Sequence, residues 1–326
     1  MVRMNDTATS STPASFEHLS APAADGAVPL APLGVITAEG ADAAHFLHGQ
    51  LTQDIDHLDA AQARPAGYCS PKGRLLASFV VWRPQPETVH LACSADVLPA
   101  VLKRLSMFVL RAKCTLRDAS AELRLFGLAG PSARAWLGAA ADAPAWRSVA
   151  HGAGRAIRLP DAAGVERWLL ALPAAEAAPA LPALPLALWQ WLEVASGVPT
   201  VVGATVEQFV PQMVNLELVG GVHFQKGCYP GQEVVARSQY RGTLKRRAFL
   251  FRADAPAAPG QEVYAADDPS QPAGMVANAA SLEGLGHLAL VELKLAALGQ
   301  PLALGSPDGP RLRRVAMPYA VPLDAT

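Results

Sequence analysis

The sequence predicts an α+β fold: two α+β units with antiparallel sheets, followed by a small C-terminal β-barrel or sandwich. Three observations lead to this prediction. Segments with strand and helix periodicity alternate along residues 34–117, a similar order recurs along residues 123–195, and short apolar runs between Pro and Gly residues follow Lys245. With 326 residues, of which 51% are hydrophobic, the chain is long enough for two or three domains with sizeable cores.

A hairpin is the clearest expected feature of the first unit. Its strands, Ala66–Ser70 and Leu75–Arg83, flank the turn residues Pro71, Lys72 and Gly73. The other elements expected in this unit are strands at Gly34–Ala38, Thr88–Ser94 and Lys113–Arg117 and helices at Ala41–Thr52 and Asp96–Leu105.

The second unit repeats this mixture, although the identity between the two passes is too weak to prove a duplication. We expect strands at Leu123–Leu128, Arg155–Leu159 and Trp168–Leu172 and helices at Pro131–Ala139 and Leu186–Ala195. The third region is expected to form strands around Arg247–Arg252, Gln261–Tyr264, Gly274–Val276 and His287–Val291.

Composition also predicts the boundaries and the compartment. Residues 1–26 are rich in Ser, Thr, Ala and Pro without a signal-peptide core, so we expect a disordered, dispensable tail. Residues 27–245 then hold the two α+β units, interleaved or in series, and residues 246–326 form the barrel. The apolar segment Ala171–Ala195 is interrupted by four prolines and Glu176, so no membrane span is expected. Together these features predict a cytoplasmic protein.

Charge and cysteine content exclude several classes of function. The formal net charge is −1, so no global field attracts nucleic acid or an anionic membrane. The four cysteines, Cys69, Cys93, Cys114 and Cys228, form no C-x-x-C pair, which disfavours a structural zinc site or a self-contained iron–sulfur site. We therefore expect reduced thiols and no metal site.

The densest chemistry lies in Gly220–Arg247. Gly227, Pro230 and Gly231 predict a tight turn that exposes Cys228 on an elbow. A helix expected at Gln232–Gln239 would place its positive end near this thiol and favour the thiolate. The neighbouring Lys226 would act in the same direction, so Cys228 is the candidate catalytic residue.

Six cations in this segment also predict a local anion-binding surface, because Glu233 is the only carboxylate among them. A polyglutamate tail, a phosphate, a nucleic acid or an acidic partner could bind there. The cations are Lys226, Arg237, Arg241, Lys245, Arg246 and Arg247. The alternative is a solvated connector with an incidental thiol, since a lone cysteine without an adjacent histidine is a weak sign of nucleophilic catalysis and His223 is five residues away.

The run K-G-C-Y-P-G-Q-E at Lys226–Glu233 resembles the K-G-C-Y-x-G-Q-E motif of the YgfZ family. The similarity extends over about residues 28–320. Its further matches are P-Q-x-x-N-L from Pro211 to Leu216, R-G-x-x-K-R from Arg241 to Arg246, F-L-x-G-Q-x-T-x-D from Phe46 to Asp54, and the Lys72–Gly73 turn.

This resemblance implies a fold like that of the glycine-cleavage aminomethyltransferase, with two α+β units and a C-terminal β-barrel around a folate channel. It implies tetrahydrofolate or a one-carbon derivative as ligand, and a role in assembling or repairing iron–sulfur enzymes, including those that modify tRNA. The residues expected to hold the cofactor are Lys226, Tyr229, Gln232, Glu233, Arg237, Arg241 and Lys245.

The carboxylates of the catalytic relative are missing. Its Asp-Asp pair falls here on Leu76 and Ala77, and its pterin-binding glutamate on Ala195; Glu193 is two residues away, about 200° around a helix. We therefore expect an accessory protein rather than an aminomethyltransferase, with a one-carbon transferase of rearranged site as the alternative. Direct nucleic-acid binding is disfavoured, because Tyr229 and Tyr240 are the only aromatic residues from Lys226 to Arg247.

Overall fold

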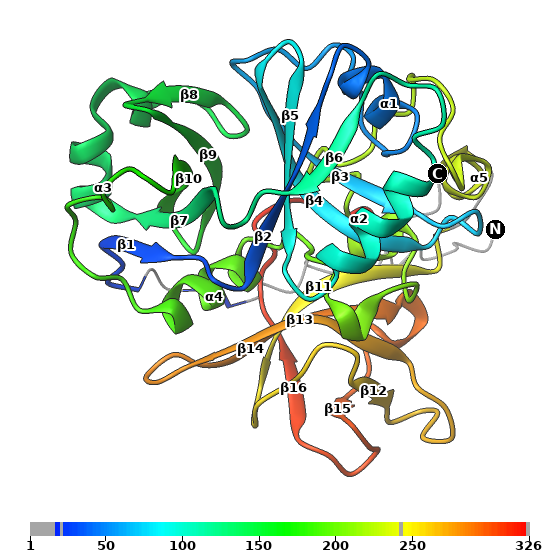
Figure 1. Cartoon of the computed structure of the whole chain (residues 1–326). Coiled ribbons are helices and arrows are strands. Elements are labelled where there is room, and N and C mark those ends of the chain that lie inside the picture. Colours follow the sequence, from blue (N-terminus) through cyan, green and yellow to red (C-terminus); the bar gives the residue numbers. More distant parts are fainter. Residues whose placement is uncertain (1–16, 20–21, 241–243, 324–326) are drawn as a thin grey trace, which may run out of the picture.

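Two antiparallel sheets lie side by side above a closed six-stranded barrel (Figure 1). The computed structural model describes residues 17–19, 22–240 and 244–323. Each sheet has five strands, and the barrel order is β11-β14-β13-β12-β15-β16. The predicted α+β fold class is thereby confirmed. No helix within the described ranges has the length and apolarity that crossing a bilayer requires.

The first sheet has the order β3-β4-β5-β2-β6. Its predicted hairpin is confirmed by β3 and β4, which pair from Ala63↔Trp82 to Cys69↔Leu75. The elements of this unit are β2 (Leu33–Glu39), α1 (Ala43–His48), β3 (Ala63–Cys69), β4 (Leu75–Gln85), β5 (Thr88–Ser94), α2 (Leu98–Met107) and β6 (Thr115–Asp118). The first helix is shorter than predicted, because the chain leaves it at Gly49 and turns so that Thr52 N donates to Gly67 O at 2.9 Å.

The second sheet has the order β1-β7-β10-β9-β8, and its first strand comes from before the first sheet. Gly26 of β1 lies opposite Ala129 of β7, so the two units are interleaved. The elements are β1 (Gly26–Pro29), β7 (Leu123–Ala129), α3 (Gly130–Leu137), β8 (Ser148–His151), β9 (Gly154–Ala162), β10 (Val165–Pro173) and α4 (Leu186–Ala195).

The expectation of a disordered tail is wrong for residues 22–26. Ala24 is buried in the core, and Asp25 accepts hydrogen bonds from Ser132 N at 2.7 Å and Ser132 Oγ at 2.6 Å. Gly26 already belongs to β1. Residues 1–16, 20 and 21 lie outside the described residues.

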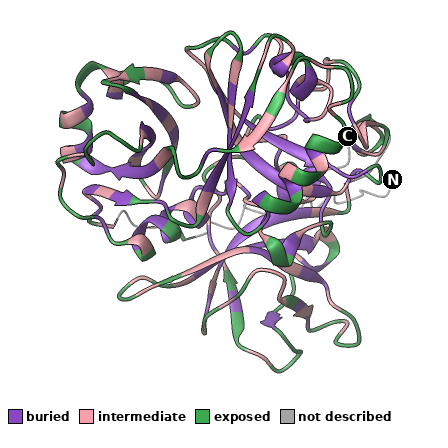
Figure 2. Cartoon of the chain, in the orientation of Figure 1, coloured by how far each residue is buried: buried purple, intermediate pink, exposed green. Residues whose placement is uncertain are grey.

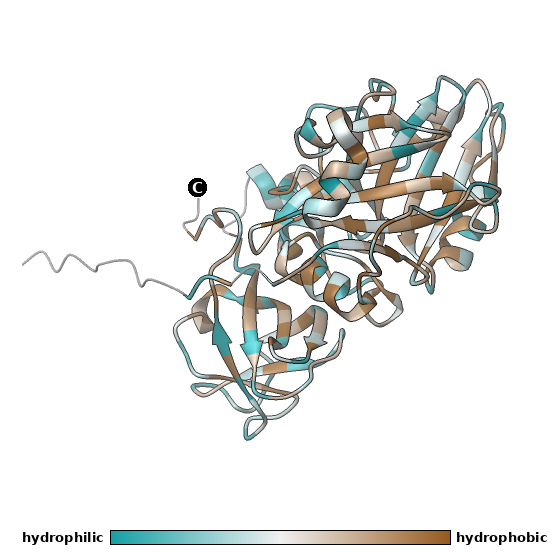
Figure 3. Cartoon of the chain, turned by 90° about the vertical axis from the view of Figure 1, so that its left-hand side faces the viewer, coloured by the Kyte–Doolittle hydropathy of each residue, from teal (hydrophilic) through white to brown (hydrophobic). Residues whose placement is uncertain are grey.

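After α4, the chain crosses to the first sheet before it enters the barrel. This crossing contains η2 (Gly203–Thr205), η3 (Pro211–Val214) and α5 (Gln232–Tyr240), and α5 confirms the predicted helix. The barrel strands are β11 (Arg246–Ala253), β12 (Glu262–Ala265), β13 (Gly274–Leu282), β14 (Gly286–Lys294), β15 (Leu302–Leu304) and β16 (Arg311–Arg314), with η4 (Leu295–Ala297) after β14. In β11 and β14 the apolar residues are consecutive, at residues 248–251 and 288–291, and both faces of these strands are buried there; Figure 3 shows the chain coloured by hydropathy.

One core joins all three parts. Along β2, Val35 faces the second sheet and α4, whereas Ile36 faces α1 and α2. The shared core also takes Trp189 from α4 and Leu250 from the barrel. Figure 2 shows buried residues concentrated where the strands converge, with exposed residues on the loops. A cavity at this convergence is therefore walled by three structural units.

Candidate functional site

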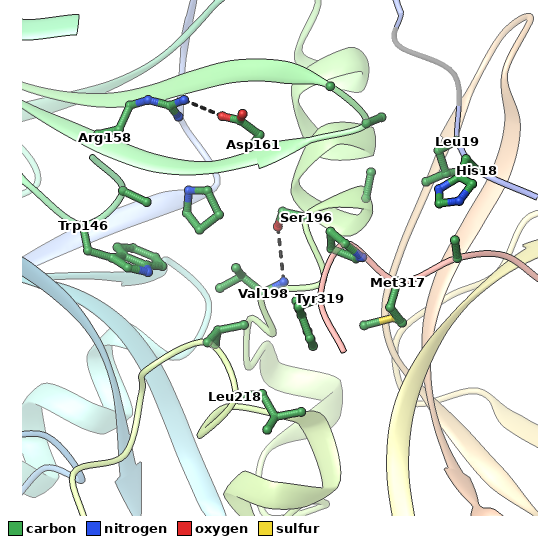
Figure 4. A pocket seen from close by; sticks show the side chains of 18 residues that line it. His18, Leu19, Trp146, Arg158, Asp161, Ser196, Val198, Leu218, Met317 and Tyr319 are labelled. Carbon is green, nitrogen blue, oxygen red and sulfur yellow. Dashed lines mark hydrogen bonds and ion pairs between the residues drawn. The ribbon is translucent and has the colours of Figure 1, made fainter. Parts of the chain in front are cut away.

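Three adjoining cavities lie at the meeting point of the sheets, α4 and the barrel. The largest is about 680 Å³, with Trp146 on one side and Met317 on the other (Figure 4). A narrow neck of about 60 Å³ shares Trp146 and Val198 with it and extends to Trp189 and Glu193. A third cavity of about 280 Å³ shares Trp189 and Glu193 with the neck. We call these three cavities the central channel.

Trp189 is held between two groups where it lines the channel. It is 3% exposed, and a Cβ built on Gly127 would lie 2.5 Å from its Cδ2 atom, so only glycine leaves room for the indole. The guanidinium of Arg167, in β10, lies 5.3 Å from the ring centroid of Trp189. The indole is therefore a fixed part of the channel wall.

Trp146 bridges the two sheets at the other side of the neck. Its backbone N donates to Arg158 O in β9 at 2.7 Å, and its O accepts from Ala63 N in β3 at 2.8 Å. Its φ is +66°, a conformation that bulky L-residues rarely adopt. Such strained backbone is concentrated at ligand-binding sites, where the surroundings hold it in place.

A buried ion pair supplies charge to the channel. Arg167 is 1% exposed, and it donates to Glu193 Oε1 at 2.5 Å and to Pro160 O at 3.1 Å. The Glu193 side chain is 38% exposed, so its carboxylate is accessible from the channel. Among the described residues, Glu193 and Asp161 are the carboxylates that line the channel, and Asp161 is paired with Arg158.

The positions that carry carboxylates in the aminomethyltransferase offer none here. Ala77 is buried against α1 and α2, away from the channel, and the β4 residues that line the neck, Ser78, Phe79 and Val80, carry no carboxylate. On α4, Ala195 lines the 680 Å³ cavity and Glu193 lines the other two. Ala195 and Glu193 thus both line the channel, but from different sides of α4.

The motif residues 226–231 form an elbow elsewhere, against the turn between β3 and β4. Gly231 and Gly73 have φ values of +79° and +71°, and a Cβ on Gly231 would lie 2.4 Å from Ser70 O. Cys228 is exposed on this elbow, and α5 begins four residues later at Gln232. The sequence correctly predicted this exposure.

Lys226 fixes the elbow to the end of α1. Its Nζ donates to His48 O and, at 2.8 Å, to Leu51 O, and it lies 4.8 Å from the ring centroid of the buried Tyr229. Burial lowers the pKa of Lys226 to about 8, although Asp54, Asp56 and Cys228 act against this shift. Lys226 is therefore a half-buried structural cation beside the thiol.

The predicted local anion-binding surface contained six cations, and for two of these the prediction is wrong because they are held in ion pairs. Arg247 forms a buried ion pair with Glu217, and Arg246 binds Glu292. A third, Arg237, pairs with Glu233 at 2.6 Å. The sequence window contained one carboxylate, but the fold brings Glu217 and Glu292 in from outside it. Lys245 is exposed, and Arg241 lies outside the described residues.

None of the described residues predicted to hold the cofactor lines the central channel. The structure gathers Lys226, Tyr229 and Cys228 at the elbow and places Gln232, half-buried, with Glu233 and Arg237 on α5. The channel residues Trp146, Trp189 and Arg167 were not singled out from the sequence. Their signals there were weak: tryptophans in apolar segments and one arginine within a strand.

Comparison with protein families matches residues 8–165 to the GCVT N-terminal domain. The whole fold is similar to the crystal structure of glycine cleavage system aminomethyltransferase T from Bartonella henselae, with a TM-score of 0.68 over 95% of this chain and 88% of that chain. Sequence identity is 17%, so this likeness shows the fold alone. The chain thus has the architecture of an aminomethyltransferase T.

Sequence relatives define the family more closely. The tRNA-modifying protein YgfZ of Edwardsiella ictaluri is 34% identical over 235 residues, covering 68% of this chain and 69% of the relative. The YgfZ proteins of Vibrio vulnificus and Serratia proteamaculans are each 31% identical, covering 70% and 72% of both chains. The chain belongs to the YgfZ family, which confirms the resemblance found in its motifs.

Proposed function

We propose that this chain is a folate-binding accessory protein that supports iron–sulfur enzymes, including enzymes that modify tRNA. The observation that carries folate binding is the central channel, whose walls combine two tryptophans with the carboxylates of Glu193 and Asp161. Pockets for small molecules are mostly apolar, measure about 300–1,000 Å³ and contain a few polar anchors. The link to tRNA rests on the relatives, which are named as tRNA-modifying proteins.

The channel fits a reduced folate by its chemistry. Trp146 and the channel-lining edge of Trp189 suit a flat heterocycle, and the Glu193 carboxylate can accept hydrogen bonds from ring N–H groups. Arg167 keeps this carboxylate in place. When bound, tetrahydrofolate supplies a carrier for a one-carbon unit. The proposed roles of the elbow residues are to present Cys228 to a client protein or cluster, because a thiolate can ligate iron or attack a disulfide.

Glycine substitutions give a direct test of the channel. Gly127→Ala places a methyl group against Trp189 and should weaken tetrahydrofolate binding in calorimetry by roughly tenfold, which corresponds to about 1.4 kcal/mol. Gly299→Ala is the matched control, because a Cβ there meets no atom within 4 Å. No binding of any reduced folate to the unaltered protein would refute the proposal.

The one-carbon transferase remains the alternative. General acid–base assistance contributes about 10²–10⁴ in rate, and β4 provides no carboxylate for it. A direct role for Cys228 in transfer would require the elbow to line the channel, and none of residues 226–231 does. Transfer of a one-carbon unit from a charged folate to a small acceptor by the purified protein would favour this alternative. Failure of Cys228→Ser to sustain iron–sulfur enzyme activity in cells would favour the accessory role.

A further inference from the structure

A second set of interacting side chains lies outside the central channel, at the end of α1 beneath the elbow. His48, the last residue of α1, has a side chain that is 14% exposed. Its Nδ1 lies 3.0 Å from Asp54 Oδ1. Asp54 also accepts hydrogen bonds from the backbone N of His57, at 3.2 Å, and from its ring, at 2.8 Å.

Nδ1 of His48 lies 3.0 Å from Asp54 Oδ1 and 3.5 Å from the backbone N of Asp56, and the shorter contact, with Asp54, determines which nitrogen carries the proton. Burial opposes ionisation of Asp54, but the hydrogen bonds from His57 outweigh it and lower the pKa of this carboxyl group. An ionised carboxylate only accepts hydrogen bonds, so Nδ1 of His48 is the donor. The lone pair of a neutral imidazole is then on Nε2.

Nε2 of His48 faces the elbow. A Cβ built on Gly227 would lie 3.4 Å from Nε2, and Gly227 has none, so the imidazole approaches the backbone directly. Cys228 is the next residue, with its Cα about 3.8 Å further along the chain. The hydrogen bonds of Lys226 to His48 O and Leu51 O hold this geometry from the other side.

We propose that His48 accepts the proton of the Cys228 thiol, with Asp54 as the residue that orients it. In this step the S–H bond breaks, the proton moves to Nε2, and the electron pair stays on sulfur. The arrangement of nucleophile, base and orienting carboxylate is that of other activated thiols. The inference rests on the proposed function insofar as that function uses Cys228 as a thiolate.

The charged groups around His48 fit this role. Burial first, and then the cation of Lys226, lower the pKa of His48, while Asp54 and Asp56 raise it. The imidazole is therefore neutral at physiological pH and free to accept a proton. The other neighbours are His45, with ring centroids 6.5 Å apart, and His57 across Asp54. Among the described residues, no group of His, Cys, Asp and Glu is arranged to hold a metal ion.

The test is the pH dependence of Cys228 alkylation by iodoacetamide, followed by peptide mapping. In this reaction the S–C bond forms as the C–I bond breaks and iodide leaves. His48→Gln should slow alkylation of Cys228 at pH 7 roughly tenfold, and the rates should converge with those of the unaltered protein near pH 10, where thiols ionise without assistance. Asp54→Asn should give a smaller loss in the same direction.

His45→Gln is the matched control. His45 lies on the same helix, but its side chain is 83% exposed and contacts Asp56 instead of the elbow. Its pH profile should equal that of the unaltered protein. A profile of His48→Gln that superimposes on that of the unaltered protein would overturn the proposal.

A second measurement avoids any folding defect in the variants. In the unaltered protein with labelled histidines, alkylation of Cys228 should change the NMR titration of His48, and an unchanged titration would also overturn the proposal. Tetrahydrofolate titrations on the same samples separate the two hypotheses. A protein that fails to bind folate but keeps the dependence of alkylation on His48 would refute folate binding and leave the thiol–imidazole pair supported.

Discussion

Replacing Glu193 with Leu is expected to destabilise the fold more than replacing Arg167 with Met. Arg167 is 1% exposed and Glu193 is its carboxylate partner, so Glu193→Leu leaves a buried cation whose remaining contacts, the Pro160 carbonyl and the Trp189 ring, carry no negative charge. Breaking a buried ion pair in this way costs about 3–5 kcal/mol. Glu193 is 38% exposed, and water can solvate it after Arg167→Met, so we expect a loss of about 1–2 kcal/mol there.

Thermal unfolding followed by circular dichroism measures this difference. Unfolding entropy is about 2.1 cal/mol/K per residue, or about 0.7 kcal/mol/K for this chain, so the two losses correspond to decreases in Tm of about 4–7 °C and about 1–3 °C. The double variant should melt above Glu193→Leu alone, because it removes the stranded cation. Equal losses for the two single variants, or a double variant that melts lowest, would refute this account of the pair.

Three further predictions concern reactivity, the N-terminal segment and pH. Brief alkylation at neutral pH should label the exposed Cys228 first. Burial raises the pKa of Cys69 and Cys93 to about 12 and that of Cys114 to about 11, so these thiols react slowly. Peptide maps in which another cysteine is labelled first would contradict this prediction. A variant that begins at Ala27 should melt several degrees below one that begins at Glu17, because it loses buried Ala24 and both Asp25 hydrogen bonds; equal melting would show that these contacts contribute nothing. Burial lowers the pKa of His90 to about 4; Glu39 opposes this shift and Arg117 adds to it. Between about pH 6.5 and pH 4 the unfolded state therefore binds a proton that the folded state does not. The free energy of unfolding should fall by up to about 3 kcal/mol as the pH decreases through this range. His90→Gln should flatten this part of the urea-midpoint profile, and an unchanged slope would exclude His90 as its source.

Features that depend on local sequence were predicted well. The β3–β4 hairpin follows from two apolar runs around Pro71, Lys72 and Gly73, and α5 follows from the end of the Pro-Gly turn. The exposure of Cys228 followed from the glycines on either side of it. In each case the residues that determine the feature lie within about ten positions of one another.

Features that depend on distant residues were missed. Arg247 and Glu217 are 30 positions apart, and Arg246 and Glu292 are 46 apart, so a count of charges in one window overstated the free positive charge. The channel depends on the contact of Gly127 with Trp189, which no periodicity reveals. A tryptophan in an apolar helix is equally typical of a core residue, and Trp189 is indeed buried.

The pairing of β1 with β7 has a consequence for synthesis of the chain on the ribosome. Ala27 is made first, yet its partner Leu128 follows about 100 residues later, which at 5–20 residues per second means about 5–20 s. The five strands of the first sheet, from β2 to β6, all emerge within this interval and can pair among themselves. During this time the short segment Gly26–Pro29 has an unsatisfied edge, so a nascent chain that stalls before residue 129 exposes a strand that the finished protein conceals.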